Sequence, residues 1–274
     1  MPSPLLKGNP RFLNSVLLGG GTLANCRAAR IAGFDQIELW RQDVEAFTAD
    51  APALGHALRS LELGLTDYQV LLDFDGAPDA RRSEKRDEAL EMLDTALDVG
   101  ATTLLVPAST DADCNAERVD DDLRWLCAQA AQRGVRIAYE SMAWSTRQAT
   151  LPDAWACVQR VGADNLGLVV DAFHLFVGGR TLADLDGIPA SRIFLVQLSD
   201  LARRVGQEDL VNVARHRRLL PGQGHFPLRA LVERLEEMGY AGPVGLEVFN
   251  DRLRAGDPDE VALQAMNALR GVLG

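Results

Sequence analysis

Residues 135–171 read VRIAYESMAWSTRQATLPDAWACVQRVGADNLGLVVD. Two short aliphatic runs, VRIAYES at 135–141 and LGLVVD at 166–171, flank the helical pattern LPDAWACVQRVG at 151–162. A strand, a helix and a second strand in this order predict two parallel strands joined by a right-handed crossover. The stretch therefore predicts a protein of the α/β class.

The same alternation of a short aliphatic run and a helical pattern continues along the whole chain. Four of the helical patterns close on a glycine before the next run, at Gly33, Gly100, Gly134 and Gly162, where helices commonly end. Eight such pairs in 274 residues predict a single (β/α)8 TIM barrel that covers residues 1–274 as one domain. The predicted strands are 14–19, 34–40, 63–74, 102–108, 135–141, 166–171, 192–200 and 243–250, and the predicted helices are 22–33, 51–62, 83–100, 116–134, 151–162, 181–187, 227–240 and 258–274.

An open, doubly wound sheet is the alternative for alternating strands and helices. That fold would place a glycine-rich phosphate-binding turn after the first strand. The segment GGGT at 19–22 lacks the GxGxxG spacing, so the barrel is the preferred prediction.

Composition and charge exclude several classes of partner. The net charge of −11 opposes binding to nucleic acid and to anionic membrane surfaces. The first residues, MPSPLLKGNPRF, lack the apolar core of a signal peptide, and no apolar run reaches the length of a membrane span. Cys26, Cys114, Cys127 and Cys157 form no CxxC pair, which is typical of reduced thiols. We therefore expect a cytoplasmic protein.

Lysine is rare in this chain. Lys7 lies near the N-terminus, and Lys85 lies in the charged run ARRSEKRDE, which predicts an exposed helix start. Neither position suggests a desolvated lysine that could form an imine with a substrate, so Schiff-base chemistry is disfavoured.

Polar residues follow the last four predicted strands. In a TIM barrel the catalytic groups lie at the C-terminal ends of strands, and Glu140, Asp171, Gln197 and Glu247 occupy those positions in strands five to eight. Three carboxylates in one cavity repel one another and require protonation or a cation. Because the donor set is all oxygen, it favours Mg²⁺ or Mn²⁺, with Co²⁺ or Zn²⁺ as substitutes. These four residues are the predicted metal ligands.

Further candidates surround the predicted metal site. His174 follows the metal-binding acid by three residues and is predicted to act as general acid or base, together with Glu140 and Glu247. Trp144 lies just past the fifth strand and is expected to line the substrate pocket. Glu38, in the second strand, is predicted to support the site or to contact substrate, with an ordinary salt bridge as the other interpretation.

The loop after the seventh strand carries a cationic patch. Arg215, His216, Arg217 and Arg218 stand side by side in ARHRRLLPGQGHF. On the catalytic face such a patch suits an anionic substrate with a carboxylate or phosphate, and we take Arg215, His216 and Arg217 as substrate-binding candidates. The other interpretation is a solvated surface run.

Five segments carry a resemblance to a known family: AYESMAW, LVVDAFHLF, IFLVQLSD, RHRRLLPGQG and GLEVFND. With them, nearly the whole chain resembles the xylose isomerase-like TIM-barrel superfamily of sugar phosphate isomerases and epimerases. Within that superfamily the segments are similar to those of the bacterial metal-dependent 3-dehydroshikimate dehydratases.

The resemblance implies a function and a site. The family's metal ligands fall on the four polar residues at the strand ends, its active-site histidine falls on His174, and RHRR matches a substrate-binding segment. The implied activity is that of a divalent-metal-dependent lyase acting on a hydroxylated keto acid through a metal-stabilised enolate. The alternative is a sugar (phosphate) isomerase or epimerase, or a hydroxypyruvate isomerase-like enzyme, that uses the same metal site. A barrel retained as a small-molecule sensor is a third, non-enzymatic reading.

One position departs from the dehydratase pattern. That pattern reads Arg-Asp-Phe-Glu-Gly after the third strand, whereas this chain reads LDFDG, with Leu72 in place of the arginine. A positive charge expected to face the substrate is therefore missing, which leaves another hydroxylated keto acid or a ketose open as the substrate. Barrels of this kind often pair, so a homodimer is a further expectation.

Overall fold

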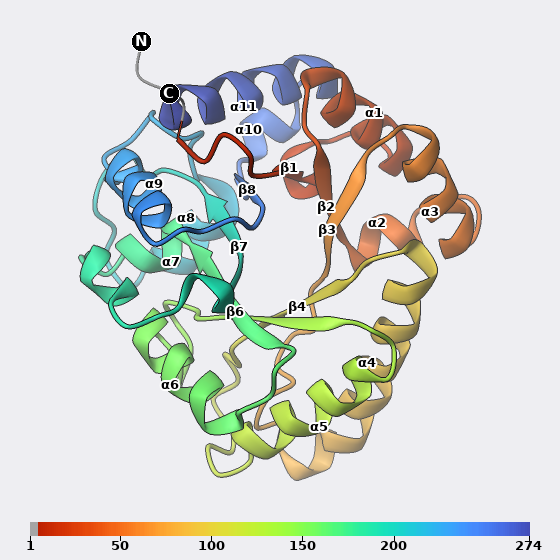
Figure 1. Ribbon diagram of the computed structural model, residues 1–274, viewed down its shortest axis with the longest axis vertical. Coiled ribbons are helices and arrows are strands. Elements are labelled where there is room, and N and C mark those ends of the chain that lie inside the picture. The colour runs from red at the N-terminus through yellow and green to blue at the C-terminus, as the bar shows by residue number, and fades with distance from the viewer. Residues whose placement is uncertain (1–4) are drawn as a thin grey trace.

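The computed structural model describes residues 5–274. Eight parallel strands close into one barrel in chain order, with helices around it (Figure 1). The predicted (β/α)8 barrel is therefore confirmed and the open sheet is excluded. Of the predicted span 1–274, residues 1–4 lie outside the described residues. The strands are β1 (Arg11–Asn14), β2 (Gln36–Trp40), β3 (Gly64–Gln69), β4 (Thr103–Pro107), β5 (Arg136–Glu140), β6 (Leu166–Asp171), β7 (Ile193–Leu198) and β8 (Val244–Leu246).

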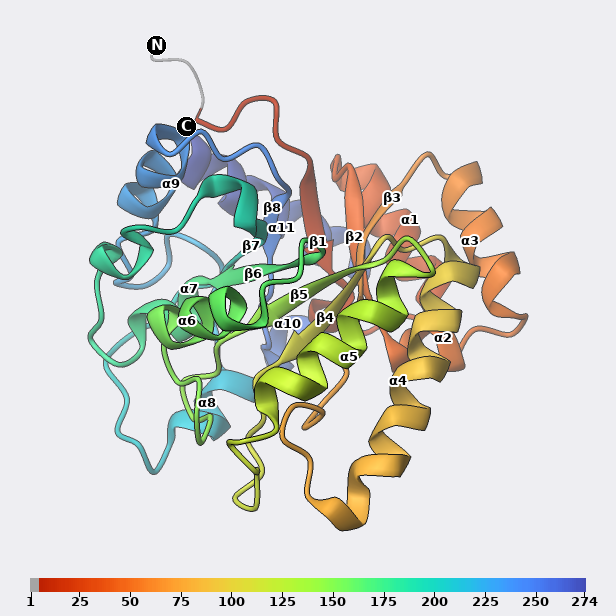
Figure 2. The ribbon, with the colours of Figure 1, turned by 60° about the horizontal axis from the view of Figure 1, so that its bottom comes forward.

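Helices cover the outside of the barrel and also occur in the segments after the strands. In the side view, α8 and the loops that follow the strands project from the end of the barrel away from the two chain termini (Figure 2). The helices are α1 (Thr22–Ala32), α2 (Arg41–Glu45), α3 (Ala51–Ser60), α4 (Asp79–Val99), α5 (Val119–Ala131), α6 (Leu151–Val161), α7 (Ala172–Phe176), α8 (Leu210–His216), α9 (Leu228–Glu237), α10 (Asp251–Arg254) and α11 (Pro258–Leu273), with 3-10 turns at η1 (Ser15–Leu17), η2 (Leu182–Leu185) and η3 (Ala190–Arg192).

Glycines end several helices, as predicted. Gly33, Gly100 and Gly162 are the C-caps of α1, α4 and α6, with φ angles of 97°, 86° and 70° in the left-handed region. Gly134 follows α5 with a φ of 68°. Only glycine adopts this conformation without a Cβ penalty, which is why these positions mark the helix ends so clearly in the sequence.

The first strand lies earlier than predicted. It spans Arg11–Asn14 rather than 14–19, because the Asn14 side chain accepts a hydrogen bond from the Val16 backbone amide at 3.0 Å and caps a 3-10 turn. Leu17 and Leu18 of the apolar run are buried in the core shared with the helices. An apolar 3-10 turn and a buried strand have similar composition, so the sequence pattern could not separate them.

Two predictions on the C-terminal half also need correction. The helix predicted at 181–187 is only the 3-10 turn η2, which Thr181 caps and after which Gly187 has a φ of 77°. The short helix α7 directly after Asp171 takes its place after β6. In addition, the long loop predicted after the seventh strand contains α8, which ends at His216.

Side chains inside the barrel form two layers. Because side chains alternate along a strand, residues two apart share a face. The lower layer is an apolar cluster, separate from the core shared with the helices, that includes Phe12, Leu105, Ala138, Val169 and Leu195. Two residues further along the same five strands stand Asn14, Pro107, Glu140, Asp171 and Gln197. The interior of the barrel therefore changes from apolar to mostly polar at the C-terminal ends of its strands.

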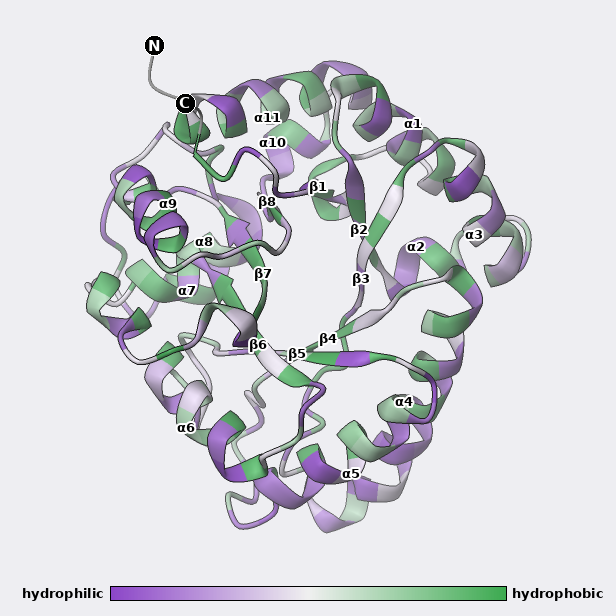
Figure 3. Cartoon of the chain, in the orientation of Figure 1, coloured by the Kyte–Doolittle hydropathy of each residue, from purple (hydrophilic) through white to green (hydrophobic). Residues whose placement is uncertain are grey.

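The surrounding helices are amphipathic. They alternate between hydrophobic and hydrophilic residues in Figure 3, as expected where one face of each helix packs on the barrel. Among residues 5–274, no helix is both long and apolar enough to cross a membrane. All four cysteines are free and buried, in agreement with the predicted reduced thiols.

Lys85 is buried, contrary to the prediction of an exposed helix start. Helix α4 begins at Asp79 rather than at residue 83, so Lys85 lies in its second turn and faces the segment after β3. Its Nζ donates hydrogen bonds to the Leu72 carbonyl and to Glu88 Oε2, both at 2.8 Å. The lysine therefore holds the backbone of residues 70–78, which we call the β3–α4 loop.

Asp75 is the central anchor of the β3–α4 loop. Its carboxylate accepts hydrogen bonds from the Ser109 amide at 2.9 Å and from the Tyr139 hydroxyl at 2.7 Å. Burial raises the pKa of Asp75 from 3.8 to about 7, and the two hydrogen bonds oppose part of that rise. The loop is thus fixed to β4 and β5 through a carboxyl group that ionises near neutral pH.

Replacing Asp75 with asparagine tests this anchor. Because the folded pKa lies above the unfolded one, the stabilising contribution of Asp75 is present at low pH and is lost as pH rises towards about 7. From pH 5 to pH 8 the unfolding free energy of the parent should fall by about 2 kcal/mol more than that of Asp75→Asn. Urea denaturation at the two pH values measures the difference. The exposed change Asp164→Asn is the control, and an equal difference for Asp75→Asn at both pH values would contradict the assignment.

Candidate metal centre at the barrel mouth

The four predicted metal ligands lie at one end of the barrel. Glu140 and Asp171 are the last residues of β5 and β6, Gln197 lies within β7, and Glu247 follows β8 directly. Each has a relative exposure of 5% or less. Asp171 is in register with Gln197, and Gln197 is in register with Gly245, two residues before Glu247. The parallel strands therefore deliver these side chains to the same interior layer.

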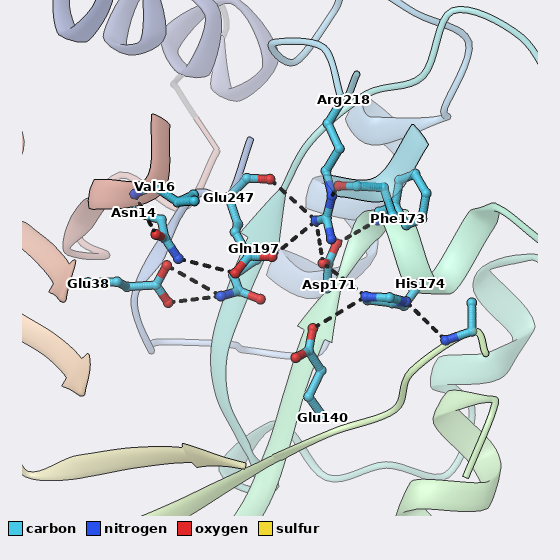
Figure 4. Close-up of polar contacts among 12 residues, drawn as sticks. Asn14, Val16, Glu38, Glu140, Asp171, Phe173, His174, Gln197, Arg218 and Glu247 are labelled. Atoms are coloured by element: carbon cyan, nitrogen blue, oxygen red, sulfur yellow. Dashed lines mark hydrogen bonds and ion pairs between the residues drawn. The ribbon is translucent and has the colours of Figure 1, made fainter. Parts of the chain in front are cut away.

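Arg218 lies between two of these acids (Figure 4). Its Nη1 donates to Asp171 Oδ2 at 2.7 Å and to Glu247 Oε2 at 3.1 Å. The guanidinium also lies 4.6 Å from the ring centre of Phe173 and 5.1 Å from that of Phe249. Arg218 is thus a buried cation between aromatic rings whose charge neutralises part of the acid cluster.

Glu38 orients the amide of Gln197. Gln197 Nε2 donates to the two carboxylate oxygens of Glu38 at 3.0 and 3.3 Å. Gln197 Oε1 has no hydrogen-bond partner among the described residues. Glu38 is fully buried, and its pKa is raised by burial and by the neighbouring charges of Asp67 and Glu247. Glu38 therefore orients the side chain of a predicted ligand, and its role in the site stays a prediction.

Asn14 links β1 to the same layer. Its Nδ2 donates to Glu247 Oε1 at 3.2 Å, and its Oδ1 accepts from Trp40 Nε1 at 2.9 Å. Asn14 therefore both caps η1 and orients Glu247.

His174 is held in one tautomer by the backbone. Its Nδ1 accepts a hydrogen bond from the Ala143 amide at 3.0 Å, so in the neutral ring the proton is on Nε2. Nε2 lies 3.8 Å from Glu140 Oε1 and 3.8 Å from Asp171 Oδ2. Burial lowers the pKa of His174 to about 4, because the charged ring is poorly solvated there. At neutral pH His174 therefore presents an N–H donor to the acids.

The donor set fits a divalent cation. Ligand atoms of Glu140, Asp171 and His174 lie within 4.8 Å of one another. Glu140 Oε1 and Gln197 Oε1 are both buried without a hydrogen-bond partner among the described residues. Buried polar atoms are normally paired, so two unpaired oxygens beside an acid cluster indicate a missing positive partner. These residues can hold a metal ion.

The raised pKa values of the acids in the cluster also favour a bound cation. The pKa of Glu140 is raised well above its ordinary value, first by burial and then by repulsion from Glu247 and Asp171. Burial also raises the pKa of Glu247 to about 7, although Arg218 opposes the rise. A cation bound among these groups would favour their ionised forms.

A cavity of about 420 Å³ opens above the cluster. Glu140, Glu247, His174 and Arg218 form part of its lining. Of the predicted substrate-binding residues, Trp144, Arg215 and His216 also line it, whereas Glu38 lies buried below. Arg217 lines two neighbouring surface depressions instead. The structure thus brings together most of the predicted site and places Arg217 to one side of it.

Several residues of this site were not singled out from the sequence. Arg218 stood in the cationic patch but was not separated from its neighbours, and Asp67 and Asn14 were read simply as parts of strands. Asp67 carried a usable signal, because it is an acid within an otherwise strand-like run and lies two residues before Gln69 on the same face. Arg218 carried no such signal in the sequence. Its side chain points elsewhere than that of Arg217 only because helix α8, which was not predicted, ends just before both residues.

Comparison with known proteins agrees with this geometry. Residues 26–272 match the family described as xylose isomerase-like TIM barrel. The chain belongs to that family. The resemblance drawn from the sequence is therefore confirmed for the family.

Individual relatives point to two kinds of enzyme. The chain is 34% identical over 264 residues to the 3-dehydroshikimate dehydratase of Pseudomonas aeruginosa, in a match that covers 94% of this chain and 41% of that protein. It is 27% identical over 253 residues to the inosose isomerase of Halalkalibacterium halodurans, covering 87% of this chain and 84% of that protein. A solved xylose isomerase-like TIM barrel/4-hydroxyphenylpyruvate dioxygenase fusion protein has a TM-score of 0.90 and 29% identity, covering 95% of this chain and 42% of that chain. This member of the family therefore spans about two fifths of the dehydratase that it matches.

Removing Arg218 tests the electrostatics of the cluster. Arg218→Met would leave two buried acids without their cation, and we expect the unfolding free energy at pH 8 in EDTA to fall by about 3–5 kcal/mol. The loss should be smaller at pH 5, where Glu247, whose pKa is raised to about 7, is protonated. Urea denaturation measures both values.

The matched control for this test is Arg217→Met. Its side chain is exposed, so we expect a change within about 0.5 kcal/mol at either pH. A similar small effect for Arg218→Met would show that the buried acids do not depend on this cation.

Proposed function

We propose that this barrel is a divalent-metal-dependent lyase that dehydrates a small hydroxylated keto acid, with 3-dehydroshikimate as the leading substrate. The observation that carries the proposal is the convergence of Glu140, Asp171, Gln197 and Glu247 on one buried layer with two unpaired oxygens. The P. aeruginosa relative bears the name of that dehydratase, and the match covers 94% of this chain. Because the chain spans only 41% of that relative, its activity and substrate are proposals.

The proposed metal is Mg²⁺ or Mn²⁺. The proposed ligands are carboxylate and amide oxygens, which hard divalent ions prefer. Co²⁺ and Zn²⁺ are expected to substitute, because both also accept carboxylate oxygens as ligands. The ion would supply Lewis-acid polarisation of the substrate keto group.

The chain's own groups supply the proton transfers. Glu140 lines the cavity, so its carboxylate is placed to take the proton from the carbon next to the keto group. The same proton can then go to the β-hydroxyl, which leaves as water. The Ala143 amide engages His174 Nδ1, so Nε2 carries the proton of the neutral ring and lies 3.8 Å from Glu140 Oε1. Of the acid and base roles predicted for His174, the tautomer favours the donor role.

The second candidate is an isomerase or epimerase with the same metal site. Glu140 and Glu247 both line the cavity, so one could remove a proton from a ketose carbon and the other return it. The match to an inosose isomerase over 87% of this chain supports this reading. Both reactions begin with the same proton abstraction and differ in whether a hydroxyl leaves.

An activity screen separates the two candidates. With Mn²⁺ and 3-dehydroshikimate, a dehydratase forms an aromatic product, and we expect ultraviolet absorbance to grow. Glu140→Gln and Asp171→Asn should each lower turnover by at least about 100-fold while circular dichroism stays unchanged. EDTA should abolish the parent's activity and Mn²⁺ restore it.

Two results would count against the dehydratase. Absence of any absorbance change at micromolar enzyme would remove it as the leading proposal. Wash-in of solvent deuterium into inosose or hydroxypyruvate without loss of water would establish the isomerase in its place.

Glu38 offers a test of metal binding that does not depend on turnover. Glu38→Ala removes the acceptor that orients Gln197, and we expect Mn²⁺ affinity to fall by about 10–100-fold. Glu38→Gln keeps an oxygen acceptor in the same place, so its loss should be several-fold smaller. Calorimetric titration with Mn²⁺ measures both, and equal losses would mean that the charge of Glu38, rather than its hydrogen bond, supports the site.

A further inference from the structure

One side of the cavity at the barrel mouth is apolar. Val70 and Leu72 line it from the β3–α4 loop, and Met142 and Trp144 line it from the segment after β5. We call these four residues the apolar wall. Leu72 is 47% exposed and lines this cavity. The other large apolar side chains exposed among the described residues do not line it: Ile31, Leu97 and Leu263.

The position of Leu72 is fixed by its backbone. Lys85 Nζ donates to the Leu72 carbonyl at 2.8 Å, and Asp73 Oδ1 accepts from the Thr110 amide at 2.8 Å. Asp75 anchors the next turn to β4 and β5. Because the backbone is tied at Leu71, Leu72 and Asp73, the Cα of Leu72 is held beside the cavity. The exposed apolar surface is therefore a built feature of the site.

The facing side of the cavity carries free cations. Arg215 on α8 and Arg254 at the end of α10 line it, and both are exposed. Among residues 5–274 neither guanidinium forms an ion pair, whereas Arg218 is committed to Asp171 and Glu247. Arg215 follows β7, which lies across the closed barrel from β3, the strand before Val70 and Leu72, and Arg254 follows the neighbouring β8. We call Arg215 and Arg254 the cationic rim.

We infer that the site binds a ring-shaped substrate in one orientation, with a single carboxylate on the cationic rim and an unhydroxylated ring edge against the apolar wall, and that Leu72 is a specificity-determining residue. This inference rests on the proposed metal-dependent function and names its substrate class. The buried acids below repel an anion, and Asp251, the acid that lines the rim side, is paired with His216, so Arg215 and Arg254 are the groups that favour the carboxylate. A hydroxyl placed against Leu72 would lose its hydrogen bonds to water without gaining a partner, which disfavours fully hydroxylated rings such as inosose.

Two aromatic probes test the cationic rim. Both 1,2-dihydroxybenzene and 3,4-dihydroxybenzoate offer vicinal oxygens to the metal, and only the second carries a carboxylate. With the full chain loaded with Mn²⁺ under anaerobic conditions, we expect calorimetry to show about tenfold tighter binding of the benzoate. Arg215→Gln combined with Arg254→Gln should reduce that preference to about threefold or less. Arg252→Gln, at another exposed arginine of α10, is the control and should keep the parent's ratio.

Leu72→Asn tests the apolar wall with the same probes. We expect both probes to bind about three- to tenfold more weakly, with their ratio unchanged, because the wall contacts the ring rather than the carboxylate. Leu97→Asn, at a leucine 56% exposed on α4 that does not line the cavity, should bind both probes as the parent does.

The outcomes separate this inference from the function beneath it. A parent that binds Mn²⁺ but shows equal affinity for the two probes, or an unchanged ratio in the double arginine variant, overturns the carboxylate assignment. Parent-like affinity in Leu72→Asn overturns the role of the wall. If Mn²⁺ itself does not bind, or if neither probe binds the Mn²⁺-loaded protein, the proposed function fails and this inference fails with it.

Discussion

The rest of the site depends on one electrostatic constraint: the barrel buries more negative charge than its own residues can neutralise. Glu38, Asp67, Glu140, Asp171 and Glu247 are all nearly inaccessible, and the only cation in contact with this group among the described residues is Arg218. The buried His174 cannot make up the difference, because burial lowers its pKa to about 4 and leaves it neutral. Acids in such a place either share protons or share a cation. The unpaired oxygens of Glu140 and Gln197 show where a cation would find open ligands.

The fold creates this constraint through the simplest property of a strand. Side chains repeat with a period of two, so the apolar residues that fill the lower barrel fix which residues must point inward above them. Ala138, Val169 and Leu195 pack in the barrel interior, and Glu140, Asp171 and Gln197 follow two positions later. Packing of the apolar layer thus fixes the positions of the side chains in the polar layer.

This relation explains which parts could be predicted from the sequence. The β/α alternation and the positions of the four polar residues at the strand ends depend on local periodicity, so both could be predicted, while the role of those residues as metal ligands stays a prediction. The first strand was misplaced because an apolar 3-10 turn at Ser15–Leu17 resembles a strand in composition. Arg218 was not distinguished from Arg215 and Arg217, since the three differ in direction only through α8 and the backbone after it. The support that Glu38 gives to Gln197 spans 159 residues and crosses the barrel, so no local pattern could reveal it.

The division between barrel and rim also bears on how one family holds different activities. The polar layer is built by strand ends whose side chains are fixed by packing, and the proposed proton abstraction next to a keto group would use this layer whether or not a hydroxyl then leaves. The choice between those outcomes must then come from the groups that orient the substrate above the layer. In this chain those groups are an apolar wall held by Lys85 and Asp75 and a cationic rim carried by α8 and α10. On the proposed function, a keto acid and a polyhydroxylated ketone would meet the same acids, but only the keto acid would complement both the apolar wall and the cationic rim. The proposal therefore places the choice of substrate in the loops and the chemistry in the strands.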